Sequence, residues 1–312
     1  NTKYGTPSAK KPSLLYYGDM EGNGRKRLIE AKKDKKGSLV PVRGKSCSTH
    51  CMPMLGTKFP TYRAFAASVL PEIYTEQRLS DAEQFKATAF ESGALINDGK
   101  GNFTFQPLPR FAQAAPGYGV VATDIDGDGL VEVVAVQNMF TREPETGLWR
   151  GGIGVILEYG ADGAFRVEPA AETGFIVDGD AKGLTLCDLD GDNRPDFVLC
   201  QNNDKLLAWK NRGDSKPLFS VRLHGSPGNP DGIGARIIAH YTDGTVHATE
   251  MTAGNGYLSQ SQPIVYFSAA GTPIRELEIR WPDGETTKAT PDTKSHSIEI
   301  SKRLLSKTAR RP

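Results

Sequence analysis

The sequence has little of what marks membrane proteins and many enzymes. No apolar run approaches the roughly 18 residues of a membrane span. The chain contains neither a Gly-x-Ser-x-Gly nucleophile motif nor a phosphate-binding glycine loop. Its 5 histidines are scattered, without a nucleophile beside them. These absences predict a chain with no membrane span and no catalytic residues, and therefore not an enzyme.

Cysteine is sparse, with 4 residues among 312. Cys47 and Cys51 fall in an expected loop, where we predict a short disulfide or free thiols. Haem attachment needs the order Cys-x-x-Cys-His, which is absent, and a zinc site needs further ligands nearby. Cys187 and Cys200 fall within expected strands, which predicts buried thiols.

Aromatic residues make up only 8% of the chain, whereas it contains 34 glycines and 20 prolines, as is typical of turn-rich β proteins. The net charge of +1 hides an uneven distribution. Residues 1–45 contain twelve Lys or Arg and four Asp or Glu (+8), and the remainder contains 26 and 33 (−7). The basic segment predicts contact with an anionic polysaccharide or a neighbouring copy, the alternative being solvated loops. No aromatic pattern suits base stacking, so no nucleic acid partner is predicted.

Two nine-residue segments share one pattern of carboxylates. Segment 124–132 reads Asp-Ile-Asp-Gly-Asp-Gly-Leu-Val-Glu, and segment 188–196 reads Asp-Leu-Asp-Gly-Asp-Asn-Arg-Pro-Asp. Ca²⁺ prefers about six to eight oxygen ligands, and each segment offers carboxylates at positions one, three, five and nine and a backbone carbonyl at seven. The predicted ligands are Asp124, Asp126, Asp128, Leu130 and Glu132 in the first site and Asp188, Asp190, Asp192, Arg194 and Asp196 in the second.

The surroundings of both segments fit this interpretation. Gly127, Gly129 and Gly191 tolerate the positive φ angles that such a loop requires, and Asn193 is the next most tolerant residue type. The flanking apolar runs predict strands, whereas an EF-hand needs helices. The alternative is an acidic Asp-Gly hairpin turn without metal. Unpaired carboxylates at this density would repel one another, which favours two Ca²⁺ sites.

A third copy of the pattern, at 19–27, departs at its ninth position. Arg27 stands where the closing carboxylate belongs, and a guanidinium stays charged in proteins. We predict the same hairpin without metal, in which Arg27 pairs with Asp19 or Glu21.

The spacing of the copies predicts repeated four-stranded units. A helical insertion of two short helices, at about 58–92, interrupts the first unit, and Ser80 and Glu83 resemble a capping box. A hairpin at 94–105, which carries the candidate glycosylation acceptor Asn102, is expected to supply its outer strands. Strands at 154–167 complete the second unit, and strands at 206–210 and 219–223 complete the third. Radial repetition of such sheets is a β-propeller, here with three legible blades within 1–215.

These loops and hairpins resemble the FG-GAP or VCBS family of propeller repeats. Three later stretches, 228–236, 254–260 and 280–284, resemble the ASPIC/UnbV module that follows such propellers in many secreted bacterial proteins and in a cartilage acidic protein. The resemblance implies a noncatalytic extracellular protein with seven-bladed relatives. It implies no defined ligand for the ASPIC/UnbV part.

The C-terminal region, 216–302, contains further alternating apolar runs, which predict a small β-sandwich or barrel, followed by a basic tail at 303–312. Trp281 and Tyr257, with the polar run 259–262, suit a sugar-binding patch. We favour the alternative, in which Trp281 packs in the core and Tyr257 anchors a loop.

Three blades are fewer than a propeller ring needs, so upstream blades or another copy are expected to complete it. The interpretation that follows is a secreted or cell-surface calcium-binding scaffold for adhesion, matrix assembly, or binding of protein or polysaccharide. Two alternatives stay open: a filament subunit completed in trans, and a carbohydrate-active enzyme built on a propeller.

Overall fold

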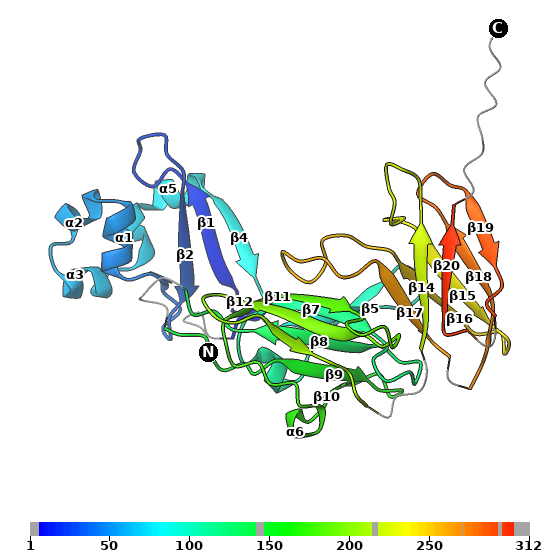
Figure 1. Ribbon diagram of the computed structural model, residues 1–312. Helices are drawn as coiled ribbons and strands as arrows, with labels where there is room; N and C mark the ends of the chain where they lie inside the picture. The colour runs from blue at the N-terminus through cyan, green and yellow to red at the C-terminus, as the bar shows by residue number, and fades with distance from the viewer. Residues whose placement is uncertain (1–5, 142–146, 214–217, 270, 293–294, 303–312) are drawn as a thin grey trace, which may run out of the picture. The chain divides into compact units, whose positions relative to one another are not determined.

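The computed structural model describes residues 6–141, 147–213, 218–269, 271–292 and 295–302 (Figure 1). The chain divides into two compact units, unit 1 comprising Asn1–Gly93 and Thr141–Leu148, and unit 2 comprising Ala94–Phe140 and Trp149–Pro312. The described elements are mostly strands in several small sheets, with one region of short helices. The predicted β-rich class is therefore confirmed, whereas the closed ring of blades stays a prediction. The basic tail at 303–312 lies outside the described residues.

Unit 1 contains a four-stranded antiparallel sheet in the order β3-β2-β1-β4. Its strands are β1 (Ser13–Gly18), β2 (Arg27–Lys33), β3 (Leu39–Pro41) and β4 (Glu83–Ala87). β1 and β2 pair directly, so the hairpin predicted around 19–27 is confirmed. One face of this sheet buries Tyr16, Ile29 and Ala31 in a hydrophobic core shared with the helices.

The helical insertion is longer than predicted and begins earlier. Five short helices separate β3 from β4: α1 (Lys45–Cys51), α2 (Met54–Lys58), α3 (Tyr62–Ala67), α4 (Leu70–Tyr74) and α5 (Glu76–Asp81). Pro53 separates α1 from α2 and Pro60 separates α2 from α3, because proline cannot continue a preceding helix, whereas Pro71 lies in the first turn of α4. Leu55, Leu70 and Ile73 are fully buried between them.

The capping of these helices also differs from the expectation. Ser80 lies inside α5 and Glu83 begins β4, so the predicted capping box does not form. Instead, the hydroxyl of Thr61 accepts a hydrogen bond from the Ala64 N–H at 3.1 Å, and the Glu72 carboxylate accepts one from the Val69 N–H at 2.9 Å. Each satisfies an N-terminal donor of its helix.

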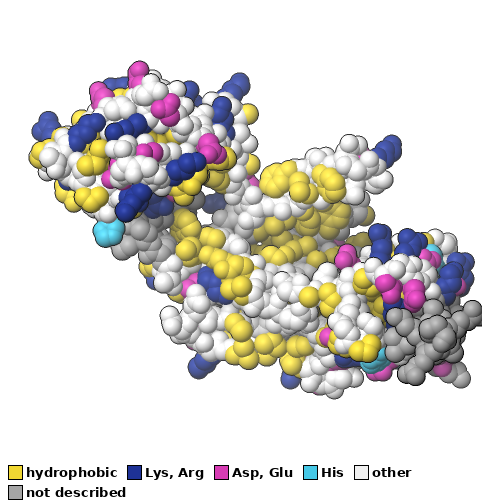
Figure 2. Space-filling view, turned by 90° about the horizontal axis from the view of Figure 1, so that it is seen from above, with side chains coloured by type: hydrophobic (Ala, Val, Ile, Leu, Met, Phe, Trp, Pro, Cys, Tyr) yellow, Lys and Arg dark blue, Asp and Glu magenta, His cyan; other side chains and the backbone are white. Residues whose placement is uncertain are grey.

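The basic side chains of unit 1 are partly paired with acidic side chains of the same unit. Arg43 Nε lies 2.5 Å from Glu30 Oε2, and Lys26 Nζ lies 3.3 Å from Glu83 Oε1. Figure 2 shows Lys and Arg side chains scattered over this part of the molecule among Asp and Glu, rather than gathered in one patch. The predicted contact with an anionic polysaccharide or a neighbouring copy stays a prediction.

Unit 2 begins with three small sheets (Figure 1). β5 (Gly93–Asn97) and β6 (Phe103–Pro107) form a hairpin followed by the 3₁₀ turn η1 (Arg110–Gln113). β7 (Gly117–Thr123), β8 (Glu132–Gln137), β9 (Val155–Tyr159) and β10 (Phe165–Val167) form an antiparallel sheet in the order β10-β9-β8-β7. After α6 (Ala170–Thr173), β11 (Ala181–Cys187), β12 (Asp196–Gln201) and β13 (Leu207–Trp209) form the third.

The second and third of these sheets share one hydrophobic core. Val121 and Val134 from one sheet pack with Leu184 and Leu199 from the other. The approach is close at Gly119, where an added Cβ would lie 2.6 Å from the Leu184 Cβ, so only glycine fits there. Two neighbouring hairpins are thereby held together.

The C-terminal part of unit 2 is built from two further sheets. Its strands are β14 (Leu218–His224), β15 (Arg236–Tyr241), β16 (Val246–Glu250), β17 (Ile264–Ser268), β18 (Ile274–Arg280), β19 (Thr286–Ala289) and β20 (Ser297–Ser301). The sheet orders are β17-β14-β20, with β14 and β20 parallel, and β16-β15-β18-β19. Both contribute to one core that contains Val221, Ile237 and Trp281, the arrangement of a small β-sandwich.

Two strand assignments were wrong. The strand predicted at 219–223 for the third repeated unit is β14, which pairs with β17 and β20 instead, so the third sheet has three strands. The hairpin at 94–105 exists, but among the described strands β5 and β6 pair only with each other and do not join the unit 1 sheet. Asn102 lies exposed beside the turn of that hairpin.

The cysteines also differ from expectation. Cys47 and Cys51 lie on α1 rather than on a loop, and no disulfide joins them. Cys187 is half-buried and Cys200 is exposed on β12, so the prediction of two buried thiols is wrong. Trp281 is only 4% exposed, which confirms its place in the core, whereas Tyr257 is half-exposed and packs edge-on against Tyr118.

Among the residues that the structure describes, no helix is long and apolar enough to cross a membrane.

Candidate metal centres

The two acidic segments form the turns of equivalent hairpins, β7–β8 and β11–β12. Residues 124–132 are the first metal loop and residues 188–196 the second. Gly127 and Gly129 have φ angles of 78° and 95°, and Gly191 and Asn193 have φ angles of 79° and 62°. Positive φ therefore occurs at the four positions where the sequence analysis expected it. The chain can fold its carboxylates inward there without the steric penalty that a branched residue would meet.

In the first loop, carboxylates organise the backbone. Asp124 accepts hydrogen bonds from the N–H groups of Gly127 and Gly129 at 2.6 and 3.0 Å. Glu132 reaches back to accept the Ile125 N–H at 2.7 Å. The carboxylates of Asp124 and Glu132 converge with that of Asp126, so the loop brings three negative charges together.

The converging ligand atoms come from Asp124, Asp126 and Glu132, and all lie within 4.8 Å of one another. Two oxygens bound to one Ca²⁺ at about 2.3–2.6 Å are at most roughly 5 Å apart, so this triad fits the ion. Asp128 lies outside the triad and accepts the Leu130 N–H at 2.7 Å. The geometry thus brings together three of the five predicted ligands of this loop.

Burial raises the free energy of the charged carboxylates in this cluster when no cation is bound. Asp124 is 6% exposed and Glu132 is 7% exposed. Desolvation, followed by the neighbouring carboxylates, raises the pKa of Glu132 from 4.5 to about 8. Desolvation also raises the pKa of Asp124, against the lowering effect of its backbone hydrogen bonds. A divalent cation would offset both effects.

The second loop has the same arrangement of three converging carboxylates, with one difference. The carboxylates of Asp188, Asp190 and Asp196 converge within 4.8 Å. Asp196 is fully buried and accepts the Leu189 N–H at 2.9 Å, the counterpart of the Glu132 contact. Lys210 pairs with Asp190, and this hydrogen bond holds the pKa of Asp190 below its usual value. An ion at this site would compete with the ammonium group for Asp190.

One predicted carboxylate ligand of the second loop, Asp192, does not join its triad and instead accepts the Arg194 N–H at 3.0 Å. The Arg194 guanidinium donates to the Gly213 carbonyl at 2.6 Å, and ligation by the Arg194 backbone carbonyl stays a prediction. Each triad therefore leaves several of the roughly six to eight Ca²⁺ ligand positions for carbonyl oxygens or water.

The third copy of the pattern, at 19–27 in unit 1, contains a basic side chain that pairs with one of its carboxylates. Arg27 donates two hydrogen bonds to Glu21 Oε2, at 3.0 and 3.1 Å, which confirms the predicted pairing. Asp19 accepts N–H groups from Gly22 at 2.7 Å and Gly24 at 2.7 Å, as the first aspartate of the other loops does.

Sequence reasoning missed Asn211, which connects the two metal loops. Its backbone N–H donates to Asp196 at 2.8 Å, and its side-chain amide donates to the Ile125 carbonyl at 2.9 Å. The residue follows β13 in an unremarkable sequence, and no local motif marks it. The hydrogen bonds nevertheless join the ninth position of one loop to the second position of the other.

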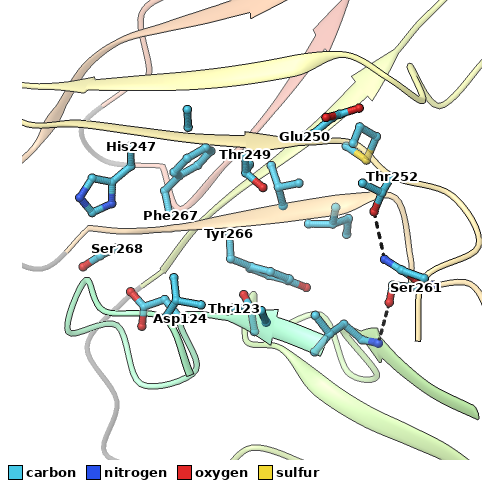
Figure 3. Close-up of a pocket in the computed structure, with 18 of the residues that line it drawn as sticks. Thr123, Asp124, His247, Thr249, Glu250, Thr252, Ser261, Tyr266, Phe267 and Ser268 are labelled. Carbon is cyan, nitrogen blue, oxygen red and sulfur yellow. Dashed lines mark hydrogen bonds between the residues drawn. The ribbon is translucent and has the colours of Figure 1, made fainter. Parts of the chain in front are cut away.

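Two cavities adjoin the first loop. One, of about 450 Å³, lies between β7, β16 and β17 and is lined by Asp124, His247, Tyr266 and Ser268 (Figure 3). The other, of about 630 Å³, is lined by Asp126, Glu132, Glu158, Glu168 and Trp209, among others. Solvent can thus reach the first metal loop from two sides.

The raised pKa of Glu132 predicts how calcium-free stability depends on pH. A carboxyl whose folded pKa exceeds its unfolded value stabilises the fold below the unfolded pKa, and that contribution is lost as pH rises from 4.5 to about 8. Each unit of difference is worth about 1.4 kcal/mol. Thermal melts of chelator-stripped protein between pH 5 and 8 should show this loss. Glu132→Gln should flatten it, and an unchanged slope in that variant would contradict the assignment.

The sequence of this chain matches one family model. Residues 225–304 match the family described as ASPIC and UnbV. Cartilage acidic protein 1 of Xenopus tropicalis is 25% identical over 195 residues, which cover 61% of this chain and 29% of that protein. The Mus musculus protein of the same name is 23% identical over 190 residues, covering 60% of this chain and 29% of its own length. The chain thus spans 29% of the length of these curated relatives.

Among solved structures, the V. cholerae biofilm matrix protein Bap1 aligns with 93% of this chain and 60% of its own chain. The TM-score is 0.20 at 10% identity, which is too low to show a common fold. The predicted resemblance to ASPIC/UnbV proteins is confirmed by the family match and the sequence relatives. The chain carries a C-terminal ASPIC/UnbV domain and is a distant relative of cartilage acidic protein 1.

Proposed function

We propose that this chain is a secreted, calcium-binding scaffold of FG-GAP/VCBS type that acts in adhesion or matrix assembly, with an extracellular protein or polysaccharide as its partner. The observation that carries the proposal is the pair of equivalent hairpin turns in which three carboxylates converge within 4.8 Å. Ions at these turns would join two strands each, which is the role of a structural metal site. Calcium is abundant outside cells, where sites of modest affinity are filled.

The proposal includes a propeller. Two hairpin-based sheets share one hydrophobic core, and each has its acidic turn between its first two strands. Repeated sheets of this kind require further blades to close a ring, from elsewhere in the protein or from another copy. If another copy supplies these blades, the chain is a subunit of an assembly. Light scattering that shows a closed, stable monomer of this chain would exclude the filament alternative.

Calcium binding is tested by calorimetry and by thermal melting with and without a chelator. We expect two ions per chain. With dissociation constants of about 10⁻⁴ to 10⁻³ M, as in extracellular modules, calcium at about 1 mM should add roughly 0.4–1.4 kcal/mol per site. For a unit of this size, two sites should raise the melting temperature by about 2–11 °C. Equal melting temperatures in calcium and in chelator, with no heat of binding, would refute the proposal.

The enzyme alternative has one feature in its favour. Glu158, Glu168 and Glu172 line the second cavity, and burial, followed by the charges of Glu158 and Glu172, raises the pKa of Glu168. A glycosidase holds its two carboxyl groups about 5 Å or more apart, with the scissile bond between them.

A further inference from the structure

Residues 256–262 of the ASPIC/UnbV domain lie along the edge of β11 that faces away from β12. β11 is the outer strand of its sheet, with β12 on its other side. The Leu184 N–H donates to the Gly256 carbonyl at 3.0 Å, and the Leu186 N–H donates to the Ser261 hydroxyl at 3.1 Å. Gln262 returns a bond from its own N–H to the Leu186 carbonyl at 2.9 Å. The segment thus serves as a substitute edge strand.

These contacts follow the period of a strand and end at the second metal loop. Residues 184, 186 and 188 direct their N–H groups to the same edge, because alternate residues of a strand face the same way. The last of them, the Asp188 N–H, donates to Gln262 Oε1 at 2.8 Å. Asp188 is the first ligand of the second triad. Gln262 therefore restrains the backbone from which the loop starts.

The first metal loop has its own contact with the same domain. Ser268, at the end of β17, donates its hydroxyl to the Gly127 carbonyl at 2.7 Å, and Ser268 is only 7% exposed. Its own carbonyl accepts the Tyr241 hydroxyl at 3.0 Å, which holds the serine in place. In Figure 3, Ser268 lies beside the loop that begins with Asp124. Gly127 directly follows Asp126, a member of the first triad, in the sequence.

We propose that Gln262 and Ser268 are positioning residues for calcium, one for each loop, so that the ASPIC/UnbV domain holds both loops in the shape that binds the ion. This inference rests on the proposed calcium function. A loop whose backbone is already restrained loses less conformational entropy when the ion binds. By linkage, calcium strengthens these two contacts as much as the two contacts favour calcium.

The test measures calcium affinity in variants of the full chain. Ser268→Ala should weaken the first site and Gln262→Ala the second, each by about 2- to 10-fold, as expected for one lost hydrogen bond. To separate the sites, Asp126→Ala removes an exposed ligand of the first loop, and Asp190→Ala removes one of the second. In the Asp126→Ala background, Gln262→Ala should weaken the remaining site and Ser268→Ala should not. The Asp190→Ala background should give the reverse.

Ser259→Ala is the matched control. It removes a hydrogen bond of the same kind, from the Ser259 hydroxyl to the Leu184 carbonyl at 2.9 Å, which joins the same domain to β11 four residues before Asp188. We expect its calcium affinity to equal that of the unmodified chain. Melting temperatures in chelator verify that all variants fold.

Three outcomes would overturn the inference. Unchanged affinity in both Ser268→Ala and Gln262→Ala would remove the positioning role while leaving the calcium sites intact. Equal weakening in Ser259→Ala would show a general effect of domain contact. Absence of calcium binding by the unmodified chain would defeat the proposed function, and the inference with it.

Discussion

Asp196→Ala should abolish calcium binding at the second loop and destabilise unit 2 by about 2–5 kcal/mol, because it leaves two N–H groups without their acceptor. Asp196 is fully buried. Its two oxygens accept the N–H groups of Leu189 and Asn211 at 2.9 and 2.8 Å, so one side chain closes its own loop and fixes the bridge to the first. Calorimetry should show one calcium ion fewer, and melting in chelator should reveal the metal-independent part of the loss.

Asp162→Ala is the control for this result. Asp162 is an exposed aspartate that pairs with Arg166 and belongs to neither triad. Surface ion pairs contribute little, so this variant should melt within about 1 kcal/mol of the unmodified chain. If Asp196→Ala were as stable as Asp162→Ala and still bound two ions, the second metal centre would be wrongly assigned.

Gly256→Ala should detach the ASPIC/UnbV segment from the edge of β11. Gly256 has a φ of +75°, and an added Cβ would lie 1.9 Å from the Leu184 carbonyl oxygen. The left-handed conformation costs a non-glycine residue about 1–2 kcal/mol, and the overlap adds roughly 1–3 kcal/mol. Hydrogen exchange should show lost protection at the Leu184 and Leu186 amides, together with a lower melting temperature.

Gly254→Ala separates the cost of the left-handed backbone from the cost of the overlap with Leu184. Gly254 has a similar φ of +67°, but no atom lies within 4 Å of the Cβ that alanine would add. This variant should therefore show the backbone cost alone and keep amide protection on β11. Comparable loss of protection in both variants would mean that the close contact at Gly256 does not hold the segment to the strand.

The features predicted well from the sequence are local ones. The acidic turns and their flanking strands follow from residue type and period over nine residues, and Arg27 with Glu21 could be paired because both lie within one turn. The apolar side chains of the C-terminal region alternate clearly enough to predict a small β-sandwich or barrel within 216–302, and the structure has a sandwich there. Short-range pattern decides such elements.

The features predicted poorly depend on partners distant in the chain. β14 reads as a strand, but its sequence does not say that it pairs with β17 and β20. The contact of Ser268 with Gly127 spans 141 residues, and that of Gln262 with Asp188 spans 74. The helical insertion was predicted as two short helices at about 58–92, whereas the structure has five short helices between Lys45 and Asp81.

The salt bridge between Arg27 and Glu21 has a consequence for how the molecule responds when calcium is withdrawn. The hairpin turn of unit 1 carries a covalently attached cation that cannot diffuse away, whereas under the proposed function the two turns of unit 2 would be neutralised by an ion in exchange with the medium. Dilution of calcium would then act on unit 2 and spare unit 1. Unfolding in low calcium should accordingly proceed in two steps, with unit 1 still folded after unit 2 has opened.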